Sequence, residues 1–386
     1  MTDRHLAARI EQIASPRMPA FSRIAAELVD IDSPTSDAAA VRNVQDILRR
    51  ELADIGADVE LTDTPNGPFL AAQLGPRGRG RVLLVGHADT VFPQGAAAGR
   101  PYREDGGIAY GPGVSDMKGC IAMCLETPRA LRETLGDGGG EAWLLISPDE
   151  EVGSPYGGPL IEQRLTRALA SLVLEAGRQD GSIVRSRQGF GTAVFQVEGR
   201  AAHAGVEPEK GINAIVETGR LIERVLAAAR NIPGVRVSPG VVQGGVRPNV
   251  VPPEARLECD IRASDAGAAA QLLEALRQIA AAPTLPGARI AFHGGLHVPV
   301  WPDDGSNARL LNLYQEGAAA LGAEVDAVRT GGGSDGNRTA AFGVPTLDGL
   351  GPIGGLDHSP DEFLDLTSVA PRAALLGYLV ARLLNN

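Results

Sequence analysis

The chain has 386 residues and a formal net charge of −11, with 44% hydrophobic and 22% charged residues. This composition excludes a disordered chain, and the length is sufficient for two domains or for one large domain with an insertion. The acidity and the 4% aromatic content argue against a nucleic-acid-binding surface. The sequence contains no run of 18 apolar residues, so no membrane span is predicted. The three cysteines lack the spacing of a disulfide scaffold. We expect a cytoplasmic protein with neither nucleic-acid nor membrane partners.

The first part of the chain predicts an α/β domain. Apolar residues at helical spacing predict a helix over 37–55. The elements expected after it are strands at 58–62, 69–74 and 81–86, a helix at 117–135, a strand at 142–147, and a helix at 158–170 followed by the apolar stretch SLVLEA. This alternation indicates a largely parallel sheet that is buried on both faces.

The pattern changes near residue 188. The next elements are expected in the order β-α-β-β-α-β, with strands at 189–199, 239–247, 254–263 and 288–294 and helices at 210–229 and 266–282. Helices expected at 306–321 and 367–384 then resume the α/β pattern. We therefore expect a discontinuous catalytic domain, 1–187 and 297–386, with an inserted α+β domain at 188–296.

Acidic and imidazole side chains follow several of the predicted strands. They are His87 and Asp89 after RVLLV, Asp149, Glu150 and Glu151 after AWLLISP, Glu175 after SLVL, Asp116 before a helix, and His358 near the C-terminus. Each has an ordinary alternative: Asp116 is compatible with a helix N-cap, and DEE with an acidic loop. Together at the carboxyl ends of parallel strands they need a cation, and these ligand types suit zinc, with manganese or cobalt as substitutes.

Five stretches in this order resemble the co-catalytic zinc peptidase and deacylase family: GHADTV, GPGVSDMKG, SPDEEVGS, GRAAHAG and DHSPDEF. That family includes aminoacylase, acetylornithine deacetylase, succinyl-diaminopimelate desuccinylase and glutamate carboxypeptidase (carboxypeptidase G). The stretches RTGGGSDGN and LGPIGGLDHS are most similar to the glutamate carboxypeptidase branch.

The resemblance implies two zinc ions per chain, replaceable by cobalt or manganese. It implies five ligands: His87 and Glu175 for one ion, Glu151 and His358 for the other, and Asp116 bridging both. It makes Asp89 the residue that orients His87, and it places a cis peptide bond after Asp116. The family usually has proline after the ligand at Glu175, whereas this chain has Ala176.

The resemblance also assigns the remaining chemistry. Glu150 is the general base for a metal-bridged water that attacks the scissile carbonyl. His203 of one subunit reaches the partner's site and stabilises the oxyanion, which requires a homodimer formed through 188–296. Asn249 and Arg262, beside one another, bind the substrate carboxylate, and the glycine loop around Gly332 borders the substrate pocket.

These assignments predict a dinuclear zinc amide hydrolase. It would release an amino acid, with C-terminal glutamate as a candidate, from a small N-acyl or peptidyl conjugate. One alternative is an N-acyl-amino-acid deacylase or desuccinylase of the same family. Another is a non-catalytic binding relative, although the complete ligand set and Glu150 argue against it.

Overall fold

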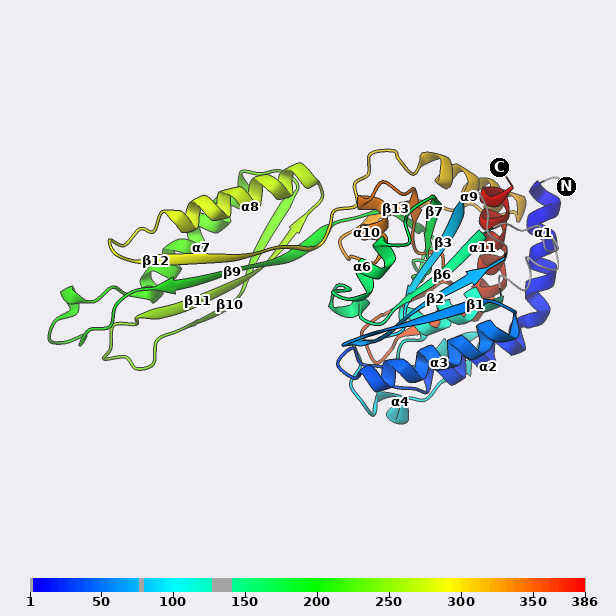
Figure 1. The fold of residues 1–386 in the computed structure, drawn as a ribbon, viewed down its shortest axis with the longest axis horizontal. Coiled ribbons are helices and arrows are strands. Elements are labelled where there is room, and N and C mark those ends of the chain that lie inside the picture. Colours follow the sequence, from blue (N-terminus) through cyan, green and yellow to red (C-terminus); the bar gives the residue numbers. More distant parts are fainter. Residues whose placement is uncertain (1–2, 76–79, 127–140, 386) are drawn as a thin grey trace. The chain divides into compact units, whose positions relative to one another are not determined.

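The computed structural model describes residues 3–75, 80–126 and 141–385 (Figure 1). They form two compact units: a large unit of Met1–Ser186, Asp303–Thr330 and Ser334–Asn386, and an inserted unit of Arg187–Pro302 and Gly331–Gly333. The inserted unit extends past the expected limit of residue 296 because its last strand continues to Val298 and Trp301 then pairs with Arg187.

The large unit is built on a six-stranded sheet in the order β1-β2-β6-β3-β7-β14. The strands are β1 Asp58–Thr64, β2 Gly67–Leu74, β3 Arg81–His87, β6 Glu141–Ser147, β7 Ala168–Val173 and β14 Thr346–Leu347. Strands β6, β3, β7 and β14 are parallel, and β2 is antiparallel to both of its neighbours. The expected mostly parallel α/β sheet is confirmed.

Both faces of this sheet are covered, which explains the continuous apolar runs in its strands. In β3, Val82 and Leu84 face one hydrophobic cluster, while Leu83 and Val85 face another. All four side chains are at most 1% exposed. Burying a side chain of this size contributes about 1.5–3 kcal/mol, so the core fixes the position of the strand and of the residues that follow it.

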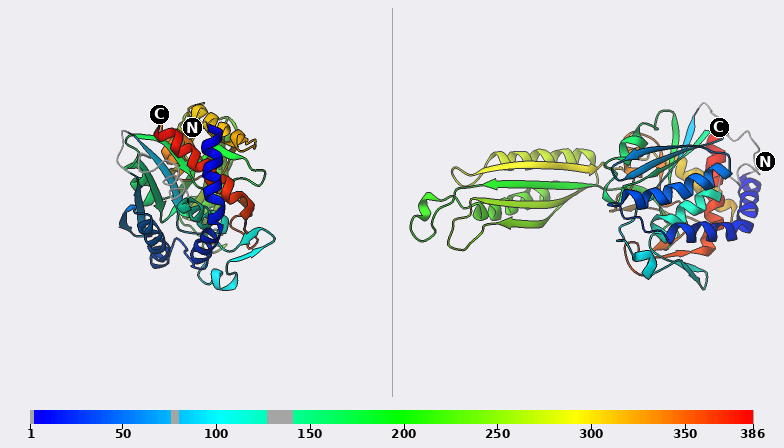
Figure 2. Two further views of the ribbon diagram at one scale, coloured as in Figure 1. Left: turned by 90° about the vertical axis from the view of Figure 1, so that its right-hand side faces the viewer. Right: turned by 60° about the horizontal axis from the view of Figure 1, so that its bottom comes forward.

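Besides a helical stretch at 119–126, the described part of the large unit contains eight helices. They are α1 Asp3–Ala14, α2 Met18–Val29, α3 Ala38–Asp54, α4 Ala96–Gly99, α6 Gly157–Glu162, α9 Ala308–Ala320, α10 Gly336–Ala341 and α11 Val369–Leu384. The Asp37 carboxylate caps α3 by accepting from Ala39 N and Ala40 N. Helix α1 packs on α11, so the two ends of the chain lie close together (Figure 2). Helices α1 and α2 precede the first helix that the pattern predicts.

Two expectations in the large unit need comment. The helix expected at 158–170 ends at Glu162, and strand β7 begins at Ala168 after a left-handed Arg167. The chain at 117–135 is helical over 119–126, after a π-helical turn at Val114–Lys118, and residues 127–135 lie outside the described residues. Smaller strands complete this unit: β4 Arg103–Asp105, β5 Ile108–Tyr110, β8 Ile183–Arg187, β13 Ala327–Thr330, β15 Gly354–Gly355 and β16 Phe363–Asp365.

The inserted unit has the expected β-α-β-β-α-β order. Its elements are β9 Gly189–Glu198, α7 Ala214–Arg230, β10 Val235–Gly244, β11 Glu254–Ala263, α8 Ala266–Ala281 and β12 Arg289–Val298. The strands form an antiparallel sheet in the order β10-β11-β9-β12. Alternate residues of β9 and β11, such as Phe195 and Leu257, pack against Leu221 of α7 and Leu276 of α8. One face is therefore buried and the other is more polar.

Among the described residues, no helix has the length and apolar character needed to cross a lipid bilayer.

Candidate metal centre and substrate residues

The register of the parallel strands brings four of the predicted residues to one edge of the large sheet. His87 lies opposite Ser147, the last residue of β6, and the loop after β6 carries Glu150 and Glu151. In β3 and β7, Val85 lies opposite Val173. His87 is two residues after Val85 and Glu175 is two residues after Val173, so both follow this pair at the same distance along the chain. Parallel strands end at the same edge, which is where α/β proteins place functional groups.

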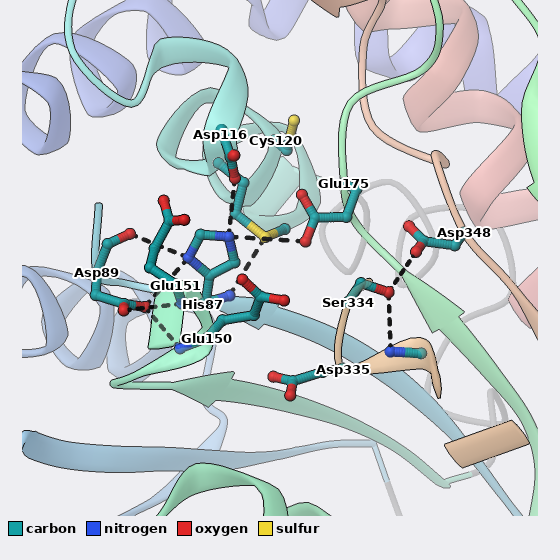
Figure 3. A network of polar contacts seen from close by, with 12 residues as sticks. His87, Asp89, Asp116, Cys120, Glu150, Glu151, Glu175, Ser334, Asp335 and Asp348 are labelled. Atoms are coloured by element: carbon teal, nitrogen blue, oxygen red, sulfur yellow. Dashed lines mark hydrogen bonds and ion pairs between the residues drawn. The ribbon is translucent and has the colours of Figure 1, made fainter. Parts of the chain in front are cut away.

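Asp116 lies between two histidine–carboxylate pairs, and Figure 3 shows the pair formed by His87 and Glu175. Its Oδ1 is 2.9 Å from Nε2 of His87, and that nitrogen is 3.7 Å from Oε1 of Glu175. Its Oδ2 is 3.1 Å from Nε2 of His358, and that nitrogen is 3.3 Å from Oε2 of Glu151. The structure thus brings together all five predicted ligands, with Asp116 common to both groups.

Two backbone features are compatible with this arrangement: the peptide bond after Asp116 and the replacement of proline by Ala176 after Glu175. The peptide bond between Asp116 and Met117 is cis, as expected. Ala176 stands where the family has proline, yet Glu175 remains beside His87, and its carbonyl accepts from Gly351 N at 2.8 Å.

The imidazoles are strongly influenced by the surrounding carboxylates. Burial by itself lowers the pKa of His87, but hydrogen bonds to Asp116 and Asp89 and the charge of Glu175 hold it well above its usual value. Hydrogen bonds to Asp116 and Glu151 raise the pKa of His358 to about 11. The site therefore concentrates negative charge, which a bound cation would neutralise.

The donor set fits divalent cations. Imidazole nitrogens and carboxylate oxygens bind zinc in proteins, as cysteine sulfur also does. His87, Asp116 and Glu151 each offer a ligand atom within 4.8 Å of the other two. Oxygen Oε1 of Glu151 is buried and accepts no hydrogen bond from the described residues, which leaves it available to a cation.

Asp89 is fully buried and contacts both His87 and the loop that carries Glu150 and Glu151. Nδ1 of His87 is 3.0 Å from the Asp89 carbonyl and 3.3 Å from its carboxylate. The carboxylate also accepts from the backbone N–H groups of Glu150 and Glu151, at 3.1 and 3.2 Å. Thr35, which the sequence analysis did not single out, donates to the same carboxylate at 2.7 Å. Asp89 therefore fixes the ring of His87 and the turn that presents Glu150.

Glu150 lies beside further carboxylates. Burial raises its pKa well above the usual value, the charge of His87 opposes this shift, and Glu175, Asp335 and Glu151 add to it. Figure 3 places the carboxylate of Asp335 next to Glu150. Asp335 is 3% exposed, accepts from the Ser154 hydroxyl, and has a second oxygen without a partner in the described chain. The sequence analysis did not identify Asp335, because it lies 185 positions from Glu150 in the printed sequence.

In the inserted unit, the predicted substrate residues form two groups at opposite ends of the sheet. His203 pairs with Val250, and Asn249 O accepts from Ala204 N. Arg262 donates to Gly331 O at 2.9 Å, in the loop that contains Gly332. Strand β11 separates the two groups: Glu254 lies opposite Glu198, whereas Arg262 lies opposite Phe190.

The expectation that Asn249 lies beside Arg262 is therefore wrong within one chain. A rise of about 3.3 Å per residue along β11 puts Glu254 and Arg262 about 26 Å apart, and Asn249 precedes Glu254. Asn249 and Arg262 are 13 positions apart in the sequence. The order of the motifs does not indicate that a strand holds them at opposite ends of the sheet.

The chain thus combines an α/β unit that carries clustered candidate metal ligands with an inserted α+β unit. A model of peptidase family M20/M25/M40 matches residues 83–382, and the chain belongs to this family. Carboxypeptidase G2 of Pseudomonas sp. (strain RS-16) is 30% identical over 385 residues, covering 97% of this chain and 90% of that protein.

Two solved structures support the fold. The aminopeptidase PepT from Bacillus cereus has a TM-score of 0.78 at 23% identity, with 95% of this chain and 98% of that one covered. The YXEP protein of Bacillus subtilis, described as a dinuclear metal binding peptidase, has a TM-score of 0.70 at 18% identity, with 96% and 99% covered.

Proposed function

We propose that the protein is a dinuclear-zinc amide hydrolase of the carboxypeptidase type. It removes an amino acid with a free α-carboxylate from an N-acyl or peptidyl conjugate, and C-terminal glutamate is the first candidate. The observation that carries this proposal is the position of Asp116, which has one histidine–carboxylate pair at each of its oxygens. The similarity to carboxypeptidase G2 supports the choice of substrate class.

In this proposal His87 and Glu175 hold one ion, Glu151 and His358 hold the other, and Asp116 is shared. When bound, the ions supply Lewis acidity and lower the pKa of water toward neutrality. Cobalt or manganese have the same preference for nitrogen and oxygen ligands and are expected to substitute.

Glu150 is the proposed general base. It accepts the proton of the attacking water and then donates it to the leaving nitrogen, so that one carboxyl group serves both steps. Asp89 positions Glu150 by accepting its backbone N–H at 3.1 Å.

We further propose that the chain forms a homodimer through the inserted unit. Strand β10 is an edge strand, and edge strands with exposed apolar side chains readily pair with another chain. Val241 and Val242 of this strand have exposed side chains, as do Val246 just after it and Val206 and Ile215 elsewhere in the inserted unit. Ile215 lies against the end of β10 at Gly244 and Gly245, so it adds apolar surface there. His203 and Asn249 belong to the same end of the unit and would act in the partner's site.

The proposal is tested by a substrate panel. N-acyl amino acids and dipeptides that differ in the leaving residue are assayed with zinc, cobalt or manganese, with the Glu150→Gln variant as the inactive control. We expect the highest kcat/KM for substrates with a free α-carboxylate, and no activity after rigorous chelation. Metal-loaded enzyme that hydrolyses none of these amides would contradict the proposal, and a preference for acyl group rather than leaving residue would favour a deacylase.

A further inference from the structure

Glu362 is a buried carboxylate that joins two segments carrying candidate metal ligands. It lies just before β16, four residues after His358, and it is 0% exposed. Its Oε1 accepts from Ser115 N at 2.8 Å and from Asp116 N at 2.9 Å. Its Oε2 accepts from Gly113 N at 2.9 Å. One side chain therefore receives three backbone hydrogen bonds from the loop that presents Asp116.

That loop needs an external acceptor. Gly113 has a left-handed φ of 77°, and Asp116 has non-helical φ and ψ values of −117° and 87°. Because the backbone is irregular here, the N–H groups of residues 113, 115 and 116 would be buried without partners if Glu362 were absent. Each unsatisfied buried group costs about 1–3 kcal/mol, so the carboxylate strongly determines the path of this loop.

A buried cation lies near the same loop. Lys118 is 1% exposed, and its ammonium donates to the Ile31 carbonyl at 2.5 Å. Lys118 thus ties the segment that follows Asp116 to Ile31, in addition to the hydrogen bonds that this loop donates to Glu362.

We propose that Glu362 is a positioning residue of the metal centre, which fixes the backbone of Asp116 relative to the segment carrying His358. This inference rests on the proposed dinuclear function, in which Asp116 serves both ions. With the three hydrogen bonds intact, Oδ1 of Asp116 faces His87 and Oδ2 faces His358. Without them, the carboxylate of Asp116 loses the backbone support that lets it serve both groups.

A purely stabilising role is the alternative, and the chain offers a matched control. Glu217 in the inserted unit is also 0% exposed. It accepts from Thr284 N, the Thr284 hydroxyl and Leu285 N at 2.7–2.8 Å. None of these three hydrogen bonds involves a candidate metal ligand. Glu217→Gln therefore imposes the same chemical change on a comparable network without affecting the metal centre.

The test compares Glu362→Gln with Glu217→Gln in the full chain. Glutamine keeps one acceptor oxygen but directs an NH2 group at one or more N–H donors. We expect a similar loss of Tm in both variants. Only Glu362→Gln should weaken binding of Zn²⁺ or Co²⁺, by about 10–100-fold in chelator competition, as is typical when a group supporting a ligand is lost. The absorption spectrum of the Co²⁺ form should change in that variant alone.

Glu362→Asp provides a second variant that keeps the charge, and circular dichroism establishes that each variant is folded. The metal affinity of Glu362→Asp should lie between those of the wild type and Glu362→Gln. Wild-type metal affinity and an unchanged Co²⁺ spectrum in a folded Glu362 variant would overturn the inference. Failure of the proposed function is distinguishable, because a wild-type chain that binds fewer than about two ions, or hydrolyses no amide, contradicts that function whatever Glu362 does.

Discussion

The two carboxylate oxygens of Asp116 face different histidines, with Oδ1 2.9 Å from Nε2 of His87 and Oδ2 3.1 Å from Nε2 of His358. The three residues come from a strand end, an irregular turn and a loop near the C-terminus. Asp116 is the carboxylate that both halves of the site share, whereas Glu175 belongs to one half and Glu151 to the other. Removal of Asp116 is therefore expected to affect both halves, whereas removal of either histidine affects one.

The first prediction compares metal content in three variants. Asp116→Ala should hold fewer than about one ion per chain, while His87→Ala and His358→Ala should each retain about one. The reason is that only Asp116 is common to both groups of ligands. Elemental analysis of the purified, dialysed proteins provides the measurement. Two tightly bound ions in Asp116→Ala would exclude the shared-ligand arrangement.

The second prediction separates the adjacent residues Glu150 and Glu151. Glu150→Gln should keep about two ions but lose about 10²–10⁴-fold in kcat, because general-base catalysis typically contributes that much. Glu151→Gln should lose metal, since its carboxylate lies 3.3 Å from His358 and has a buried oxygen without a partner in the described chain. If Glu150→Gln instead loses metal, the two roles are exchanged.

The sequence predicts the strands of the large sheet and the edge at which the candidate ligands lie, because both follow from residues that are adjacent in the chain. Val82–Val85 form an apolar run, and the polar residues that follow it must lie at the end of a buried strand. Helix α6 is shorter than predicted because periodicity alone does not distinguish a short helix followed by a strand from one longer helix.

Contacts between distant segments could not be predicted in this way. Glu362 in DHSPDEF has no unusual sequence context, yet it binds the backbone of residues almost 250 positions earlier. Asn249 and Arg262 are 13 positions apart in the sequence, but an entire strand separates them. Asp335 likewise becomes notable only when the fold places it beside Glu150 (Figure 3).

The third prediction concerns pH and Asp335. Burial raises the pKa of this carboxyl group from 3.8 to about 6, the Ser154 hydroxyl, Arg338 and His87 oppose this, and Asp149 adds to it. A raised pKa means that the folded state holds the proton more tightly than the unfolded state. The stabilisation that the proton provides is present below pH 3.8 and is lost as the pH rises through about 6.

Asp335→Asn should therefore be more stable than the wild type at pH 8, by about 1–3 kcal/mol at 1.36 kcal/mol per pKa unit. The difference should shrink as the pH falls from 6 toward 4. Urea unfolding of both proteins after the same chelation measures it, because bound cations would themselves change the pKa. A difference that stays constant from pH 5 to pH 8 would contradict the raised pKa.

The fourth prediction concerns His203, which lies in the inserted unit at the end where apolar residues of β10 are exposed. If it acts in the partner's site, heterodimers of His203→Ala and Glu150→Gln chains should recover one active site. Heterodimers of wild type with the double variant should be inactive, since the only intact base then faces Ala at position 203. Action within one chain predicts the reverse pattern. Tagged heterodimers purified from co-refolded mixtures distinguish the two outcomes.

The last prediction concerns the positive charge that binds the substrate carboxylate. Arg262 lines a cavity of about 430 Å³ together with Arg230 and Arg236. Its Nε and Nη2 donate to Asp260 at 3.0 and 3.3 Å, and its Nη1 donates to Gly331 O at 2.9 Å. Of the five donors of a guanidinium group, these contacts leave one on each terminal nitrogen, which is enough for a two-pronged pair with a carboxylate.

Amidation of the substrate carboxylate should lower kcat/KM at least about tenfold, since a charge-assisted hydrogen bond contributes about 1.5–3 kcal/mol. Arg262→Ala should cause a similar loss on the free acid but little further loss on the amide, because the interaction is already absent there. All four combinations of enzyme and substrate are measured for Arg262. If the two losses multiply independently, Arg262 does not bind that carboxylate, and another residue must provide the charge that selects a free acid.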